Sequence, residues 1–256
     1  MTPSSQSLAS PREQRLRRLD DLGAHLATRA DALALLGLGS VGVETDRLDE
    51  HSDLDFFVIV DSPAAKQRYL DDIGWLEAPH PIAYSFANSV DGRKALYADG
   101  IFVEYAVFTL DELAAGGYTG PRVIWQRSPE LTFVPNPPKP SPYDYVDYHV
   151  NEAVTNLFVG LHRDMRGERL SATRFIQQYA VDRILTIMKL TDPGRYPDVF
   201  DLSRRAEQRH PELPIGSFVR GYDGNVESAR AILGWLDDRF DLDPVIKAAV
   251  VALLEC

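Results

Sequence analysis

The sequence predicts an α+β protein, in which a mixed β-sheet with covering helices comes first and an α-helical bundle follows. Before position 135 the apolar residues form short runs of strand length, and after position 142 they recur at helical spacing. The stretch between them, 135–142, reads P-N-P-P-K-P-S-P. Because proline continues neither a helix nor a central strand, we expect an extended linker between a domain at 1–134 and a domain at 143–256.

The first half is predicted to contain a tail, two helices and several strands. The first dozen residues are expected to be frayed. A helix is indicated by leucines that recur at helical spacing, namely Leu16, Leu19, Leu22 and Leu26. A second helix is predicted over Ala64–Trp75, with Pro63 at its start. Short apolar runs predict strands at 33–38, 54–60, 82–87, 94–97 and 101–108, and Asp99-Gly100 is typical of a tight turn between the last two.

The second half is predicted to be helical almost throughout. Apolar residues recur with the period of an amphipathic helix in four segments, 145–166, 174–190, 228–240 and 244–254. We therefore expect these segments to bury their apolar faces against one another as a bundle.

The composition of the 256 residues, 45% hydrophobic and 25% charged, is that of an ordinary globular protein. No apolar run approaches the roughly 20 residues that a membrane span needs, and the first residues lack an apolar signal-peptide centre. We therefore expect a cytoplasmic protein that does not enter a membrane, either a monomer or a homodimer. The single cysteine, Cys256, excludes an internal disulfide.

The net charge of −11 falls mainly in the first half, which has 12 basic and 20 acidic residues up to Val134 (12 − 20 = −8), against 15 and 18 afterwards (15 − 18 = −3). A protein that wraps nucleic acid needs basic residues to neutralise phosphates, so a nucleic-acid partner is not expected. Acidic charge suits a cationic small molecule or a bound metal, although it also simply keeps proteins soluble.

Two aspartates flank one apolar residue at the start of the predicted strand 54–60. Alternate side chains of a strand share a face, so Asp53 and Asp55 project together while Leu54 turns into the core. Two carboxylates held this close favour a cation between them or a proton on one of them. Hard oxygen ligands select Mg²⁺ or Mn²⁺, and Mg²⁺ is usually completed by substrate phosphates. The pair therefore indicates a nucleoside-triphosphate site, although a solvated edge or a turn cap is the commoner reason for such a pair.

Two further polar positions lie at predicted strands. Gly39 would let the backbone approach a phosphate closely, and Ser40 offers a hydroxyl and an amide donor. Glu104 lies within the predicted strand 101–108. If this strand adjoins 54–60, the Glu104 carboxylate can act as a general base or as a third metal ligand; otherwise it simply faces solvent.

The segment Gly37 to Val60, G-L-G-S-V-G-V-E-T-D-R-L-D-E-H-S-D-L-D-F-F-V-I-V, resembles the signature of the nucleotidyltransferase superfamily, which has a polymerase-beta-like fold. It is most similar to bacterial antibiotic nucleotidyltransferases, especially aminoglycoside 6-adenylyltransferases. The spacing of Gly39 and Asp53 (53 − 39 = 14) fits those enzymes, as does the hairpin carrying Glu104. Arg166-Gly167-Glu168 looks more like lincosamide nucleotidyltransferases, and Glu104 stands where the adenylyltransferases carry Asp, so the acceptor stays open.

The resemblance implies a division of roles. Asp53 and Asp55 would bind metal, Gly39 and Ser40 would bind nucleotide phosphates, and Glu104 would accept the proton of the acceptor hydroxyl. The helical half is expected to form the acceptor wall, with the polar candidates Tyr148, Glu152, Asn156 and His162. The cations Arg183 and Lys189 are candidates for the β- and γ-phosphates. Such residues on amphipathic helices are more often half-buried packing residues or solvated charges.

The predicted function is therefore that of a metal-dependent nucleotidyltransferase. It would move a nucleoside monophosphate, AMP from ATP, onto a hydroxyl of a small molecule such as an aminoglycoside or lincosamide. Two alternatives stay open. One is a non-catalytic nucleotide-binding or antitoxin-like regulatory protein of the same fold, and the other is an enzyme that adenylylates proteins.

Overall fold

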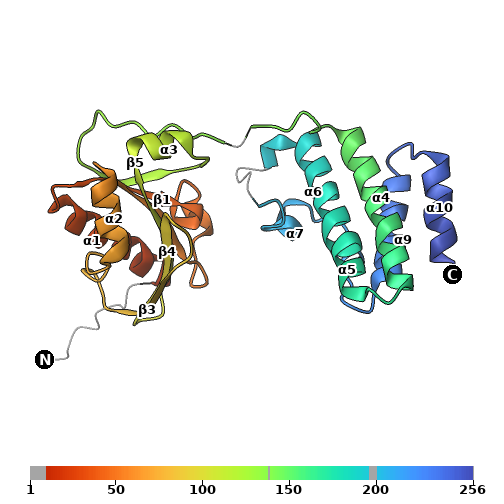
Figure 1. Cartoon of the computed structure of the whole chain (residues 1–256), viewed down its shortest axis with the longest axis horizontal. Helices are drawn as coiled ribbons and strands as arrows, with labels where there is room; N and C mark the ends of the chain where they lie inside the picture. Colours follow the sequence, from red (N-terminus) through yellow and green to blue (C-terminus); the bar gives the residue numbers. More distant parts are fainter. Residues whose placement is uncertain (1–9, 138, 196–200, 256) are drawn as a thin grey trace, which may run out of the picture. The chain divides into compact units, whose positions relative to one another are not determined.

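The computed structural model describes residues 10–137, 139–195 and 201–255, and it divides the chain into two compact units, Met1–Pro138 and Lys139–Cys256 (Figure 1). The division falls inside the proline-rich stretch. Each unit has its own apolar core. None of the helices in the described ranges is long and apolar enough to cross a membrane.

Unit 1 is built on a six-stranded sheet with the strand order β3-β4-β5-β2-β1-β6. Its strands are β1 (Ala32–Leu38), β2 (Leu54–Val60), β3 (Ile82–Ala87), β4 (Gly92–Tyr97), β5 (Phe102–Thr109) and β6 (Arg122–Gln126). The central strands β2 and β5 are parallel, and the other neighbouring pairs are antiparallel. The sheet is mixed, and with the helical second unit it confirms the α+β fold class.

The strands match the predicted runs closely, with one addition. The edge strand β6 was not predicted from the sequence. It is five residues long and pairs with β1 through a register shift between Leu35 and Leu36. A short edge strand of this kind carries little periodicity, because it is held by its partner strand rather than by a pattern of its own.

In the described part of unit 1 the α-helices are α1 (Pro11–Ala27), α2 (Pro63–Asp71) and α3 (Leu110–Ala115), and the short 3₁₀ helices are η1 (Gly39–Val41) and η2 (Thr45–Arg47). A capping box between Ser10 and Glu13 starts α1 at Pro11, so the end of the predicted tail is helical, and residues 1–9 lie outside the described ranges. The prediction that the second helix reaches Trp75 was wrong. At Asp72 the backbone is extended, and the Asp72 carboxylate accepts a hydrogen bond from the Gly74 amide (2.9 Å), which ends the helix.

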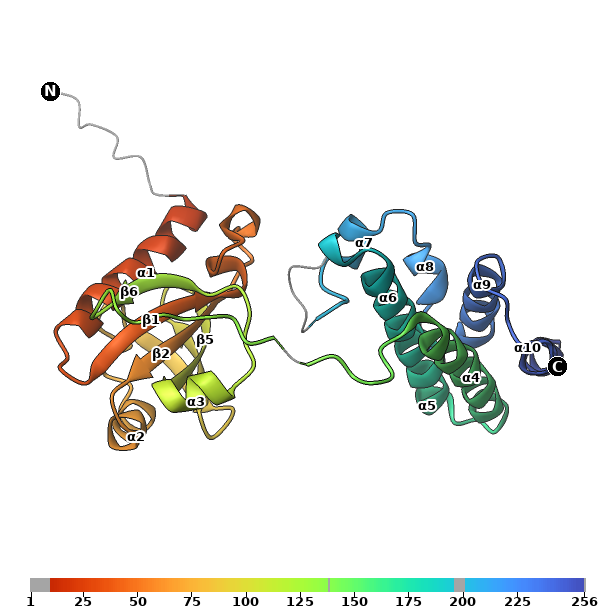
Figure 2. The same ribbon diagram turned by 90° about the horizontal axis from the view of Figure 1, so that it is seen from above.

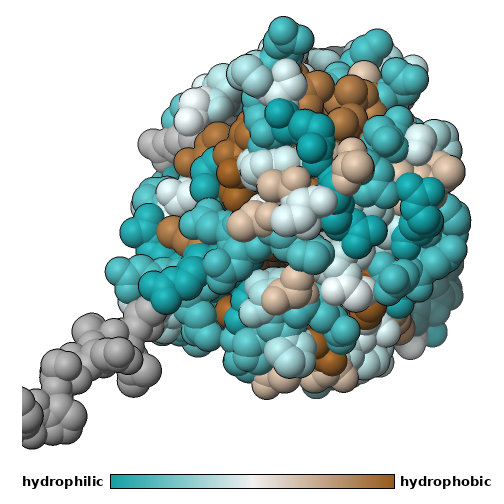
Figure 3. Space-filling model, turned by 90° about the vertical axis from the view of Figure 1, so that its left-hand side faces the viewer, coloured by the Kyte–Doolittle hydropathy of each residue, from teal (hydrophilic) through white to brown (hydrophobic). Residues whose placement is uncertain are grey.

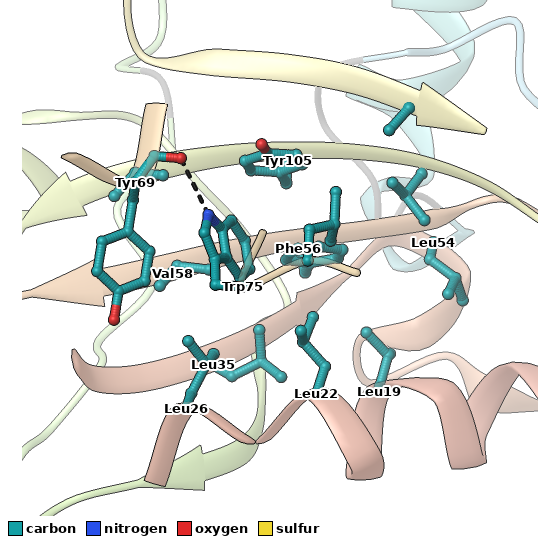
Figure 4. Packing of buried hydrophobic residues seen from close by; sticks show 14 of the residues in the cluster. Leu19, Leu22, Leu26, Leu35, Leu54, Phe56, Val58, Tyr69, Trp75 and Tyr105 are labelled. Carbon is teal, nitrogen blue, oxygen red and sulfur yellow. Dashed lines mark hydrogen bonds between the residues drawn. The ribbon is translucent and has the colours of Figure 1, made fainter. Parts of the chain in front are cut away.

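One face of the sheet packs on α1 and α2. Leu54, Phe56 and Val58 of β2 point toward the leucines of α1, as Figure 4 shows. Beyond the end of α2, Trp75 is buried in the same cluster, and its indole donates a hydrogen bond to the Tyr69 carbonyl (3.0 Å, Figure 4). Because side chains alternate along β2, residues 55, 57 and 59 belong to the opposite face of the sheet.

The opposite face is covered in part by α3. Ile59 of β2 is buried there with Leu113 of α3 and with Tyr118, and Phe57 packs against this smaller cluster. An ion-pair network holds α3 to α2: the Lys66 ammonium lies 2.7 Å from a Glu112 carboxylate oxygen and 2.6 Å from an Asp91 carboxylate oxygen. The Lys66 side chain is only 12% exposed.

We expect Lys66→Met to lower the melting temperature by about 2–6 °C at pH 7, corresponding to roughly 1–2 kcal/mol for a partly buried network. The pKa of Glu112 is lowered from 4.5 by the hydrogen bond from Lys66 and then by that from the Thr109 amide, so this stabilisation is lost as the pH falls through the lowered value. Burial opposes the charge on Lys66, but its bonds to Asp91 and Glu112 outweigh burial and raise its pKa above 10.5. The difference between Lys66→Met and wild type should therefore be full between pH 4.5 and 10.5 and shrink on either side.

Thermal unfolding of the wild type and of Lys66→Met, measured at pH 3 and pH 7, checks the expected loss of stability and its pH dependence. Lys247→Met is the matched control, because the Lys247–Asp237 pair of the other unit has both side chains well exposed, at 39% and 38%. Such a pair is worth about 0.5 kcal/mol. Equal shifts in the two variants would contradict a special role of the Lys66 network.

Unit 2 consists of helices (Figure 2). They are α4 (Val146–Met165), α5 (Arg169–Thr173), the π-helical η3 (Arg174–Tyr179), α6 (Ala180–Thr191), η4 (Pro193–Arg195), α7 (Ala206–Arg209), α8 (Ile215–Phe218), α9 (Asn225–Asp237) and α10 (Pro244–Leu254). The predicted helix 174–190 is the later part of a helical run that begins at Arg169 and passes through the π-helical segment. The α-helices α4, α6, α9 and α10 supply most of the apolar core, as expected for a bundle.

The face of the molecule seen in Figure 3 is mostly hydrophilic, and its apolar residues lie in small separate groups. Scattered apolar residues are normal on a protein surface and indicate no extensive docking patch on this face.

Candidate active site

Asp55 and Glu104 lie side by side on neighbouring parallel strands. Asp55 of β2 is the register partner of Glu104 of β5. Their chain neighbours Leu54, Phe56 and Tyr105 belong to the core beneath α1, so both carboxylates project from the opposite face. Both residues are partly exposed. The two strands are therefore neighbours, which is the condition under which Glu104 could act as a general base or metal ligand, and they place two carboxylates on one accessible face.

Asp53 and the Gly39–Ser40 turn lie at the same end of β2. Asp53 immediately precedes the strand, and the Ser40 hydroxyl donates a hydrogen bond to the Asp53 carbonyl (3.5 Å). The turn is the 3₁₀ segment η1 (Gly39–Val41), and it directly follows β1, whose last residue Leu38 is the register partner of Asp55. The Gly-Ser turn therefore lies beside the aspartate pair, although Ser40 and Asp53 are 13 positions apart in the sequence.

Position 39 requires a glycine for two reasons, its backbone conformation and the nearby Asp55 carboxylate. Its φ of +53° lies in the left-handed region, and a Cβ at this position would lie 2.7 Å from the Asp55 Oδ2. The Asp55 carboxylate is therefore packed directly against the backbone of the turn. The predicted contact of this turn with a phosphate is a separate matter and stays a prediction.

We expect Gly39→Ala to destabilise unit 1 by about 1–2 kcal/mol from backbone strain alone and, in addition, to displace the Asp55 carboxylate. Gly100→Ala is the matched control: Gly100 has a φ of +88°, but a Cβ there would meet nothing within 4 Å. Thermal unfolding and nucleotide binding measured on both variants separate strain from displacement. Similar loss of nucleotide binding in both would contradict a specific contact between Gly39 and Asp55.

Two side chains that the sequence analysis did not select hold the Glu104 carboxylate. The Lys94 ammonium lies 2.9 Å from Oε2, and the Asn88 side-chain amide donates a hydrogen bond to Oε1 (2.8 Å). Lys94 is the register partner of Glu104 across the β4–β5 hairpin. The Asp99-Gly100 turn alone does not fix this register, because a two-residue loop would set Ala95 opposite Glu104. The Tyr97 amide instead donates to the Ile101 carbonyl (3.0 Å), which leaves a three-residue loop, 98–100. The contacts with Lys94 and Asn88 orient the Glu104 carboxylate.

The three acidic residues do not form a preformed three-ligand metal site. Within the described ranges, no group of three His, Cys, Asp or Glu side chains is placed to hold a metal ion. Both oxygens of Glu104 are engaged by Lys94 and Asn88. The pair Asp53 and Asp55 nevertheless has the donor chemistry that suits Mg²⁺, which commonly takes one or two carboxylates and completes its shell with water and substrate phosphates.

Of the unit 2 residues predicted to bind the acceptor or the phosphates, three lie together and the others lie apart from them. Arg183 of α6 lies 3.3 Å from a Glu152 carboxylate oxygen and 5.7 Å from the centre of the Tyr148 ring, both on α4. His162 is exposed near the other end of α4 and packs on the ring of Phe158.

Arg183 and Lys189 do not share a face of α6. They are six residues apart (189 − 183), which corresponds to about 240° around the helix axis. Asn156 is partly exposed on α4, one turn after Glu152. The six side chains therefore lie on more than one surface of unit 2, and the roles predicted for them stay predictions.

Comparisons with known proteins give distant structural likenesses. No protein-family model matches the chain, and no curated protein matches its sequence. An aminoglycoside 6-adenyltransferase from Bacillus subtilis is 14% identical, with 97% of this chain and 92% of that chain covered and a TM-score of 0.34.

Two further solved structures are similar at the same level. A spectinomycin adenyltransferase from Enterococcus faecialis, with ATP and spectinomycin, is 11% identical, with 94% and 97% covered and a TM-score of 0.34. A STING-associated c-di-GMP synthase from Capnocytophaga granulosa is 14% identical, with 94% and 79% covered and a TM-score of 0.30. Likenesses this distant assign no function to the chain.

Proposed function

We propose that this protein is a nucleotidyltransferase that moves a nucleoside monophosphate from a nucleoside triphosphate, ATP in the first instance, to a hydroxyl of a small molecule. The observation that carries the proposal is the pairing of Asp55 with Glu104 on one accessible sheet face. Asp53 and the Gly39–Ser40 turn at the same end of β2 add a third carboxylate and backbone amide donors.

In this reaction the acceptor hydroxyl oxygen forms a bond to the α-phosphorus, the bond from that phosphorus to the bridging oxygen breaks, and pyrophosphate leaves. Glu104 accepts the hydroxyl proton, and Lys94 and Asn88 orient its carboxylate. Asp53 and Asp55 would hold Mg²⁺ or Mn²⁺. Such an ion, when bound, neutralises charge on the phosphoryl oxygens. The amides of Gly39 and Ser40 would bind the triphosphate.

Six residues of unit 2 are proposed to bind the acceptor or the phosphates. Glu152, Tyr148, Asn156 and His162 are proposed for the acceptor, with Arg183 and Lys189 for the β- and γ-phosphates. Arg183 already has a carboxylate partner in Glu152.

Incubation of the full chain with ATP labelled at the α-phosphate, Mg²⁺ and a panel of hydroxylated antibiotics tests the proposal. We expect label on a small molecule together with release of unlabelled pyrophosphate, whereas ATP labelled at the γ-phosphate should leave the acceptor unlabelled. Label on protein would instead support an enzyme that adenylylates proteins. ATP binding without any transfer, to small molecule or protein, would support a regulatory nucleotide-binding protein.

A further inference from the structure

Unit 1 contains a pocket of about 450 Å³ on the same sheet face as the two paired carboxylates. Three aromatic rings line it: the centre of the Phe57 ring lies 5.0 Å from that of Phe108 and 6.3 Å from that of Tyr118, and both pairs are edge-to-face. Small-molecule sites are typically concave, mostly apolar and about 300–1,000 Å³ in volume, with a few polar groups. This pocket has those properties.

The strands fix where the pocket lies relative to the carboxylates. Phe57 is two residues after Asp55, and Phe108 is four residues after Glu104, so all four project from one face. At about 3.3 Å per residue, the two phenylalanines lie roughly 7 Å and 13 Å along their strands from these carboxylates. A small molecule can span the nearer of these distances.

The pocket lies on the side of the site expected for the acceptor. Its walls come from β2, β5, α3, the segment 116–118 after α3, and the turn before β4, which carries Asp91. The Gly39–Ser40 turn follows β1, on the other side of β2 from β5. In phosphoryl transfer the attacking and leaving oxygens are roughly in line across the phosphorus. If the phosphates bind at the Gly39–Ser40 turn, the acceptor approaches from the β5 side, where Glu104 and the pocket lie.

The charges around the pocket define the class of ligand. Asp91 and Glu112 line it, and Lys66 bridges their carboxylates, which leaves one net negative charge (−2 + 1 = −1). Aromatic faces attract both apolar surface and a cation. The Lys66 ammonium already lies 5.4 Å from the centre of the Phe108 ring, so one uncompensated negative charge and the rings of Phe57 and Tyr118 remain for a ligand. This combination suits one amine next to an apolar face.

We propose that this pocket binds the acceptor, and that the acceptor is a hydroxylated small molecule with one cationic amine and an apolar face rather than a polycation. The inference rests on the proposed nucleotidyl transfer and narrows its substrate class. Lincomycin, which has a single basic amine, is the probe for this class, and streptomycin, which has several cationic groups, is the probe for a polycation.

The test uses two neighbouring alanines of α3. Ala115 lines the pocket and is exposed, whereas Ala114 is equally exposed but does not line it. Ala115→Trp should fill the pocket and weaken lincomycin binding at least tenfold, and Ala114→Trp should leave it unchanged. Binding is measured by calorimetry on the full chain, with thermal unfolding as the check that both variants fold and Mg²⁺-dependent ATP binding as a separate readout.

The outcomes distinguish this inference from the proposed function. Lincomycin binding that is stronger than streptomycin binding, and lost only in Ala115→Trp, supports the inference. The inference is overturned if the wild type does not bind lincomycin, if it prefers streptomycin, or if Ala115→Trp binds lincomycin as the wild type does. In each of these cases, retained ATP binding leaves the proposed function standing. Absence of Mg²⁺-dependent ATP binding in the wild type would instead overturn the proposed function.

Discussion

Asp55→Asn is expected to reduce nucleotidyl transfer by about 10³-fold or more, on the order of 4 kcal/mol in transition-state stabilisation. The substitution keeps the shape of the side chain but removes the charge that would bind a divalent cation beside the triphosphate. The Asp55 carboxylate is fixed by the backbone of the Gly39 turn and by its register with Glu104. Steady-state transfer rates at saturating Mg²⁺ measure the loss.

Nucleotide binding gives a second readout for Asp55→Asn. In the wild type, ATP should raise the melting temperature more strongly when Mg²⁺ is present, because a ligand that binds only the folded state stabilises it. This dependence on Mg²⁺ should disappear in the variant. Asp21→Asn is the matched control, since Asp21 is exposed on α1, which covers the other face of the sheet. Full transfer activity in Asp55→Asn would remove Asp55 from the site and with it the basis of the proposed function.

The sequence predicted those parts of the fold that local patterns specify. Strand β2 and the final helix α10 were predicted with the bounds that the structure has. An apolar run of strand length and a proline at the first helical position are local signals, and no distant contact is needed to interpret them. The same reasoning placed Asp55 and Glu104 on or at strands, but whether the two strands adjoin was left open until the sheet order was known.

Other features depend on contacts that no local pattern records. The end of α2 is set by a hydrogen bond from the Gly74 amide to Asp72 and by burial of Trp75, so helical spacing alone carried the prediction too far. Lys94 was overlooked because a lysine in a strand is ordinary until the hairpin register sets it opposite Glu104. The aromatic pocket joins residues of β2, β5 and α3, and its lining follows from tertiary packing alone.

Glu104→Gln is expected to lower kcat for transfer by about 10²- to 10⁴-fold while leaving the affinity for ATP unchanged, because a positioned general base typically contributes that much. The amide keeps nearly the same volume and still offers an oxygen to Lys94, so the hairpin should fold as before. It cannot accept the hydroxyl proton.

Glu130→Gln provides the control for Glu104→Gln, because Glu130 is exposed in the same unit and outside both the carboxylate site and the pocket. Single-turnover rates with bound ATP separate the chemical step from binding and product release. A loss confined to ATP affinity would indicate that Glu104 binds the nucleotide or its metal instead of the acceptor proton. Full activity in Glu104→Gln would show that the proton leaves by another route and that the ion pair with Lys94 is structural.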